Sequence, residues 1–130
     1  MNHQQGAATL LVSGLLVLGV VLSLLVVDVA RVTAARASLS AAADAAALAA
    51  APATFADFGA GRDPHRAAIE MAAANGTRLV DCLCTVDRSW AARTVQVVVA
   101  REVDLTLLGS RHLEAVAAAE FRPVDLVKRR

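Results

Sequence analysis

The sequence predicts an α+β fold in which a long amino-terminal transmembrane helix continues outside the membrane. A short helix and a small three-stranded antiparallel sheet follow. Three observations lead to this prediction: a run of 22 uncharged residues, a later segment bracketed by helix-capping residues, and three segments that alternate apolar and polar residues. We divide the chain into a leader (1–5), a transmembrane helix (6–27), an alanine-rich extension of that helix (28–51), a small α+β domain (52–123) and a basic tail (124–130).

The uncharged run extends from Gly6 to Val27. As a helix it would be about 33 Å long, which is enough to cross a hydrocarbon core of about 30 Å. A cleaved signal peptide has a shorter apolar core and a basic leader, whereas residues 1–5 contain neither Lys nor Arg. A buried helix of a soluble protein is the other alternative, but the run is longer than so small a core could cover. We therefore predict a retained transmembrane helix.

The extension from 28 to 51 contains no Pro or Gly, and thirteen of the 22 residues from Ala30 to Ala51 are Ala, the best helix former. Its polar residues form either a solvated stripe or a registry device for a neighbouring helix, because small side chains let two backbones approach closely. Leu39, Leu48 and the alanines would supply the contact surface. The candidate packing and registry residues, most of them on one i, i+4 row, are Asp28, Arg31, Arg36 and Asp44.

The basic residues on either side of the span predict how the helix is oriented in the membrane. Arg31 and Arg36 follow the span and no basic side chain precedes it in residues 1–5, so charge bias alone places the carboxyl side in the cytoplasm. Asp28 lies one turn from Arg31 and partly neutralises it, which weakens this bias.

Three segments of the extension resemble a known family. D-V-A-R at 28–31, A-A-R-A-S-L at 34–39 and A-A-D-A-A-A-L-A-A-A at 42–51 are similar to the amino-terminal signature of TadE/TadG-like proteins, pilin-like components of the Tad (tight adherence, Flp pilus) assembly system. The resemblance covers roughly residues 6–51. It implies a structural or assembly role in a Tad-type secretion or adhesion apparatus, with helix packing as the mode of action.

The resemblance also implies a location and partners. It places a short amino terminus in the cytoplasm and the carboxyl-terminal domain outside it, and we follow it over the charge bias. The implied partners are membrane lipid and either Tad-type inner-membrane assembly proteins or other pilin-like subunits. Pilin-type precursors usually carry a basic leader that ends in Gly and a Glu five residues later. Here Leu11 stands at that spacing from Gly6, so the resemblance leans towards the TadG-like side of the family.

The region after the long helix begins with a loop and a short helix. Residues 52–62 read as a loop whose Phe55 and Phe58 dock into the core. Asp63 can cap a helix that has Pro64 at its first position and ends at Asn75-Gly76. We expect its apolar stripe to consist of Ile69, Ala72 and Ala73.

Three alternating segments then predict the strands of an antiparallel meander. The first, 79–86, places Val80, Cys82, Cys84 and Val86 on its apolar face. The second, 94–106, is interrupted by Arg101, which suggests a bend or bulge near Ala100. The third, 113–121, is rich in alanines that also fit a helix, and we predict a strand.

The sequence offers no basis for catalysis, a cofactor, a metal, nucleic acid or a small-molecule substrate. The net charge is +1 and the chain has four aromatic residues, which disfavours a base-stacking surface. His65 lies near Asp57 and Asp63 in the sequence, but without the fixed spacing of metal ligands. We predict that the protein is not an enzyme. The alternative to an assembly component is a membrane-tethered module that binds another envelope protein through its sheet.

Cys82 and Cys84 are the disulfide candidates. A thiol oxidoreductase usually separates its cysteines by two residues at a helix start, so redox catalysis is disfavoured. In an extracytoplasmic domain the pair would meet oxidising conditions. Residues two apart on a regular strand lie about 6.6 Å apart between Cα atoms, near the upper limit of about 6.8 Å for a bridge. We expect an intrachain disulfide that bends the strand at Leu83; a bridge between two copies is the competing pairing.

A first prediction tests the transmembrane helix. Arg in place of Val17 or Leu18 should cost about 2.5–3.5 kcal/mol of insertion free energy, because the charge would lie at the centre of the span. The wild-type protein should fractionate with membranes and resist carbonate extraction. Carbonate release of the intact wild-type chain would contradict the prediction.

Overall fold

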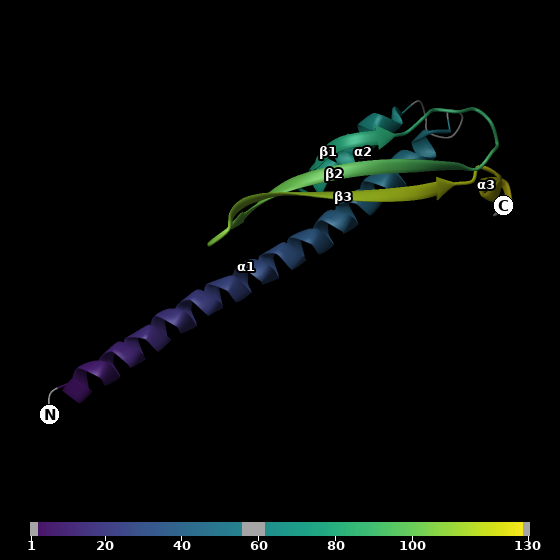
Figure 1. Cartoon of the computed structure of the whole chain (residues 1–130). Helices are drawn as coiled ribbons and strands as arrows, with labels where there is room; N and C mark the ends of the chain where they lie inside the picture. The colour runs from purple at the N-terminus through teal and green to yellow at the C-terminus, as the bar shows by residue number, and fades with distance from the viewer. Residues whose placement is uncertain (1–2, 56–61, 129–130) are drawn as a thin grey trace.

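The structure, a computed structural model, describes residues 3–55 and 62–128 and confirms the predicted α+β order (Figure 1). A long helix and a short helix precede a three-stranded antiparallel sheet in the order β1-β2-β3. The elements are α1 His3–Ala53, α2 Pro64–Ala74, β1 Arg78–Leu83, β2 Arg93–Leu105, β3 Gly109–Phe121 and α3 Val124–Lys128.

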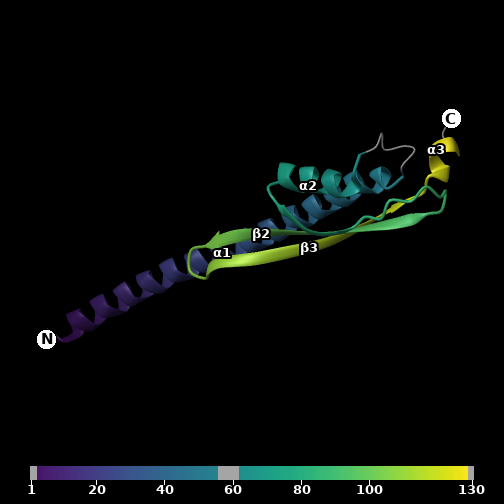
Figure 2. The same cartoon turned by 90° about the horizontal axis from the view of Figure 1, so that it is seen from above.

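The helices lie on one face of the sheet. The carboxyl-terminal half of α1 runs along β2 and β3, while α2 packs beside α1 and next to β1 (Figures 1 and 2). The amino-terminal half of α1 projects away from the other elements (Figure 2). The turn between β2 and β3 lies at the point where α1 leaves the sheet.

Helix α1 is continuous over 51 residues, and the stretch 20–51, which contains no Gly or Pro, is helical throughout as predicted. It ends two residues later than predicted, at Ala53, with Pro52 inside its last turn. A proline has no N–H to donate to the carbonyl four residues earlier. The helix closes instead through Thr54, whose backbone N–H and hydroxyl both donate to the Ala51 carbonyl, at 3.3 and 2.6 Å.

Helix α2 has the predicted ends but a different buried stripe. The Asp63 side chain accepts a hydrogen bond from the His65 backbone N–H at 3.1 Å, and Gly76 has the positive φ of 68° that favours glycine after a helix. The prediction that Ile69 and Ala73 face the core is wrong. The stripe is shifted by one residue, and the small Ala68 and Ala72 are buried while Ile69 is 44% exposed.

The core between α1, α2 and the sheet consists mainly of alanine. Leu39 is its largest helical side chain, and Val95, Val97 and Val99 supply the sheet side. Small side chains let the two helices and the sheet approach closely, and they also explain why the bulkier Ile69 is excluded from the interface. The alanines of this core are Ala43, Ala46, Ala47, Ala50, Ala51, Ala68, Ala72, Ala117 and Ala119.

Strands β2 and β3 pair without interruption along their whole length, from Arg93 opposite Phe121 to Leu105 opposite Gly109. This confirms the strand predicted for 113–121. The expected bulge near Ala100 is absent from this ladder. Arg101 stays within the inward-facing row because its guanidinium reaches α1 and donates to the Ser38 hydroxyl at 3.1 Å.

The irregularity lies in β1 instead. Its pairing with β2 shifts between Leu79 and Asp81, so Val80 has no partner in the ladder. The bulge turns Val80 away from the core and leaves it 48% exposed, which corrects the predicted apolar face. Leu79 and Cys82 pack against the core in its place. The strand ends at Leu83, before the predicted Val86, which is exposed.

An aromatic cluster closes the end of the sheet farthest from the β2–β3 turn. Phe55 is buried, as expected, and its ring meets Trp90 edge-on with centroids 5.2 Å apart. Arg93 lies over the Phe55 ring and donates to the backbone carbonyls of Thr54, Asp87 and Ser89. These bonds tie the β1–β2 loop to the end of α1. The other predicted core aromatic, Phe58, lies outside the described residues.

Helix α3 was not expected from the sequence, where residues 124–130 read as a basic tail. It is a single turn that follows the buried Pro123, with Asp125 in its first turn and Lys128 in its last. Such a short helix carries too few residues to show a periodic apolar pattern, so the sequence provides little signal for it.

The alanine core generates a second prediction. Ala46→Leu should destabilise the domain by about 1–3 kcal/mol, because Ala46 is completely enclosed and the added atoms would force the helices and sheet apart. Ala41→Leu on the exposed side of α1 is the matched control. Thermal unfolding in detergent measures the difference. Equal midpoints for the two variants would show that the interface is loosely packed.

Candidate functional site

The polar residues of α1 just beyond the apolar run form the main candidate site. Asp28, the first charged residue after the run, is completely buried. The backbone N–H groups of Thr106 and Leu107 donate to its two carboxylate oxygens, each at 2.8 Å. Both nitrogens belong to the β2–β3 turn, so one side chain of α1 binds the tip of the hairpin. Gly109 completes the turn with a φ of 69°.

These hydrogen bonds control the ionisation of Asp28. The N–H groups of Leu107 and then Thr106 lower the pKa of the carboxyl below its ordinary value of 3.8. Burial acts in the opposite direction, and the nearby Arg31 contributes a smaller lowering. The carboxylate is therefore the form that the hairpin tip stabilises.

Two further contacts support the same hairpin. The Arg31 guanidinium donates to the Thr106 hydroxyl at 3.1 Å, one turn along α1 from Asp28. Farther along, Arg101 of β2 reaches Ser38, as described above. The structure thus brings Asp28 and Arg31 together at one site, on the side of α1 that faces the sheet.

The other two candidate residues are not part of this site. Arg36 and Asp44 are exposed, and within residues 3–55 and 62–128 the structure shows no ion pair for either. With Ser40 and Leu48 they form an exposed i, i+4 ridge on α1, which we call the open ridge; Leu48 is 66% exposed. Leu39, by contrast, is buried in the core, so only one of the two predicted contact leucines is available to a partner.

Sequence reasoning missed the function of Asp28 inside the molecule. Its partners, Thr106 and Leu107, lie 78 and 79 positions away and contribute backbone groups, which any residue type can provide. The sequence contained one indication that Asp28 has a partner. It follows directly after the apolar run, where leaving a carboxylate without a hydrogen-bond partner would be costly.

Cys82 and Cys84 are joined by a disulfide in the structure, with Cα atoms 5.3 Å apart. The separation is shorter than that of a regular strand because Cys84 lies beyond the end of β1. Both residues pack at the edge of the core. Formation of this bond in the cell, and the extracytoplasmic location that it requires, stay predictions.

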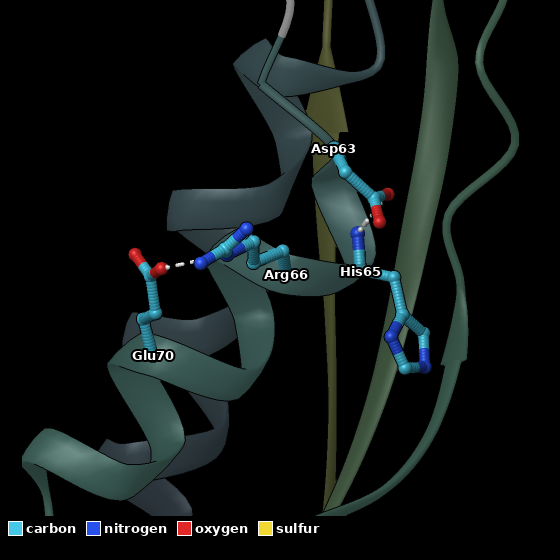
Figure 3. A network of polar contacts seen from close by, with 4 residues as sticks. All are labelled: Asp63, His65, Arg66 and Glu70. Carbon is cyan, nitrogen blue, oxygen red and sulfur yellow. Dashed lines mark hydrogen bonds and ion pairs between the residues drawn. The ribbon is translucent and has the colours of Figure 1, made fainter.

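The start of α2 gathers polar side chains without forming a reactive centre (Figure 3). Arg66 and Glu70 form an exposed ion pair at 3.2 Å, and the His65 ring points away from both (Figure 3). Exposed pairs of this kind contribute little to stability. No cluster of three or more potential metal ligands occurs among the residues that the structure describes. Asp57, which lies near His65 and Asp63 in the sequence, is outside the described residues.

The free part of α1 has the character of a membrane span. Its most apolar 18-residue stretch has a mean hydropathy of 3.0 and is not covered by any other described part of the chain. The surface of residues 8–27 is exposed except at Leu24, which is partly buried. Such a surface is expected of a helix that lipid surrounds.

Comparison with known proteins bears on this same helix. Residues 6–56 match the model of a family described as putative Flp pilus-assembly TadE/G-like. The amino-terminal segment is therefore similar to that family. The match confirms the resemblance found in the sequence and covers α1 almost completely, but less than half of the chain. No curated protein and no solved structure matches the chain. The matched segment contains both the apolar run and Asp28.

The lowered pKa of Asp28 generates a third prediction. Its stabilising contribution is complete above 3.8 and is lost as the pH falls below 3.8 through the lowered pKa of the folded protein. Wild type should therefore unfold at a higher temperature than Asp28→Asn near neutral pH, and the gap should close towards pH 2. Circular dichroism in detergent measures it. Asp44→Asn, at an exposed site, is the control; a gap independent of pH would contradict the assignment.

Proposed function

We propose that this protein is a structural or assembly component of a Tad-type, Flp pilus-like apparatus and that it acts by packing α1 against neighbouring helices. The observation that carries the proposal is the open ridge on the TadE/G-like helix. The sheet and α2 cover the other side of the extension, yet this ridge is exposed and presents Arg36 and Asp44 without ion-pair partners among the described residues.

The spacing on the open ridge suits a registry contact. Arg36 and Asp44 are eight residues apart, which corresponds to an axial distance of about 12 Å on a helix. A parallel neighbour displaced by that distance would bring its Asp44 level with Arg36. Ridges formed by residues four apart fit into the grooves of a facing helix. The alanines and Ser40 between the charges allow a close approach.

The proposal includes location and partners. α1 spans the membrane once with the short amino terminus in the cytoplasm and the domain outside it. Membrane lipid surrounds residues 6–27, and the extension contacts Tad-type inner-membrane proteins or other pilin-like subunits. The protein is not an enzyme. The family match supports the assembly role, and the Cys82–Cys84 disulfide supports an extracytoplasmic domain because such bonds form in oxidising compartments.

The fourth prediction tests the open ridge. Arg36→Asp or Asp44→Arg alone should reduce crosslinking and co-purification with the apparatus, since each places like charges opposite one another. Arg36→Asp combined with Asp44→Arg should restore the contact. Arg66→Asp, which removes another exposed arginine, on α2, is the matched control and should have no effect. Failure of the double variant to recover would exclude direct pairing.

A second candidate function is a membrane-tethered module that binds through its sheet. The face of the sheet that points away from the helices exposes Leu83 and Val116, at 60% and 57%. Val116→Ser should leave assembly intact if α1 is the contact surface. Loss of co-purification in this variant, with the open-ridge variants unaffected, would favour the binding module.

The fifth prediction tests orientation. We expect Cys82 and Cys84 to resist alkylation in intact cells until a reductant is added, and non-reducing mass spectrometry should find an intrachain bridge. Two freely alkylated thiols would contradict the extracytoplasmic location. A disulfide-linked dimer would retain that location but reject the local bridge.

A further inference from the structure

The β2–β3 turn lies at the end of the apolar run of α1. Residues 6–27 span about 33 Å as a helix, close to the thickness of a hydrocarbon core of about 30 Å. Asp28 follows at once, so it lies at the boundary between the core and the headgroup layer. Its carboxylate is 2.8 Å from the backbone nitrogens of Thr106 and Leu107. The turn is consequently held at the same depth.

Two leucines of this turn are exposed and are not part of the buried core. Leu107 and Leu108 are 44% and 49% exposed, whereas Leu105, just before the turn, is buried. On the side of α1 that carries Asp28, the residues one turn earlier are also apolar: Leu25 is 37% exposed and Leu24 is partly buried. The leucines thus extend the apolar surface of the span sideways, which is unfavourable in water and favourable against lipid.

We propose that Leu107 and Leu108 insert into the interfacial layer of the leaflet from which α1 emerges, so that the hairpin tip is a second contact with the bilayer. The inference rests on the proposed membrane span of α1. It commits to lipid because the turn is continuous with the lipid-facing surface. The charge beside the turn is compatible with this depth, since Asp28 is shielded by two N–H donors and Arg31 lies within reach of the headgroups.

A second contact would fix how the domain is oriented on the membrane. A single helix can tilt and rotate in a bilayer, and its angle is set by packing and by interfacial anchors. A hairpin tip bound to the same leaflet would restrict rotation about the helix axis. The open ridge would then face a defined direction in the plane of the membrane.

Depth-dependent quenching of tryptophan fluorescence tests the inference. The native Trp90 packs on Phe55 at the far end of the domain, about 38 Å beyond Asp28 along α1. The full-length protein is reconstituted in phosphatidylcholine vesicles whose lipids carry bromine either close to the headgroup or at mid-chain. Leu108→Trp in a Trp90→Phe background should lose fluorescence mainly with the shallow bromine. Wild-type Trp90 should be unaffected.

Two further variants make the outcome decisive. Leu18→Trp, in the span, should be quenched by mid-chain bromine. Val116→Trp, on the exposed face of β3, should resemble Trp90. A quenched Leu18→Trp with an unquenched Leu108→Trp would overturn the hairpin contact and leave the span intact. An unquenched Leu18→Trp would overturn both. Equal quenching of Val116→Trp and Leu108→Trp would show that the sheet lies flat on the bilayer, which also contradicts the inference.

The Trp90→Phe change retains an aromatic ring against Phe55. Should that background fail to fold, Leu107→Trp and Leu108→Trp are compared with wild type while Trp90 is kept. The extra fluorescence of each variant must then be quenched by the shallow bromine. Extra fluorescence that neither lipid quenches, in a protein whose Leu18→Trp variant is quenched, would refute the contact.

Discussion

The contact between Asp28 and the hairpin tip determines where the sheet lies on α1. A carboxylate with two oxygens binds two adjacent backbone N–H groups, and this geometry leaves little freedom for the turn to slide along the helix. At the other end, Arg93 binds the backbone around Thr54 and the β1–β2 loop. Between these two attachments β2 and β3 each extend for 13 residues, about 43 Å, close to the 38 Å or so of α1 that they accompany.

Alanine fills the space between the two attachments. A domain of this size buries too little apolar surface to be stable by itself, so the extension of α1 serves as part of its core. That segment must be helical and must also pack closely against α2 and the sheet. Alanine meets both requirements, because it has the highest helix propensity and its side chain is small. The few larger residues of the interface, Leu39 and the valines of β2, fill the gaps that alanine leaves. Polar contacts therefore set the position of the sheet, and alanine sets its distance from the helix.

Local signals predicted the elements, and long-range contacts account for the errors. Asp63, Pro64 and Gly76 mark the ends of α2 because each satisfies a backbone requirement within a few residues. The buried stripe of α2 was predicted from apolar character alone. The interface with α1 admits only small side chains, so Ile69 lies outside the interface. The bulge at Val80 depends on pairing with β2, which no local pattern records. Arg101 interrupts the apolar pattern of its strand, and its hydrogen-bond partner, Ser38 of α1, lies 63 positions away in the sequence.

The candidate site shows the same division between local and distant partners. The i, i+4 row that contains Asp28, Arg36 and Asp44 was visible in the sequence, but its members have different environments. Asp28 bonds within the chain, whereas Arg36 and Asp44 lie on the surface. The row winds about 40° around the helix with each step of four residues, so Asp44 lies about 160° from Asp28, away from the side that contacts the β2–β3 turn.

This arrangement restricts how neighbouring helices can approach α1. Along residues 8–27 nearly the whole circumference is exposed, so lipid or other helices can contact it from any direction. Beyond Asp28 the sheet and α2 occupy one side, and the open ridge offers the other. A helix that packs along this part of α1 must therefore lie on the side of Arg36 and Asp44. The contact at Asp28 thus has a consequence beyond the domain itself, because by fixing the covered side of the helix it also fixes the side that a partner can use.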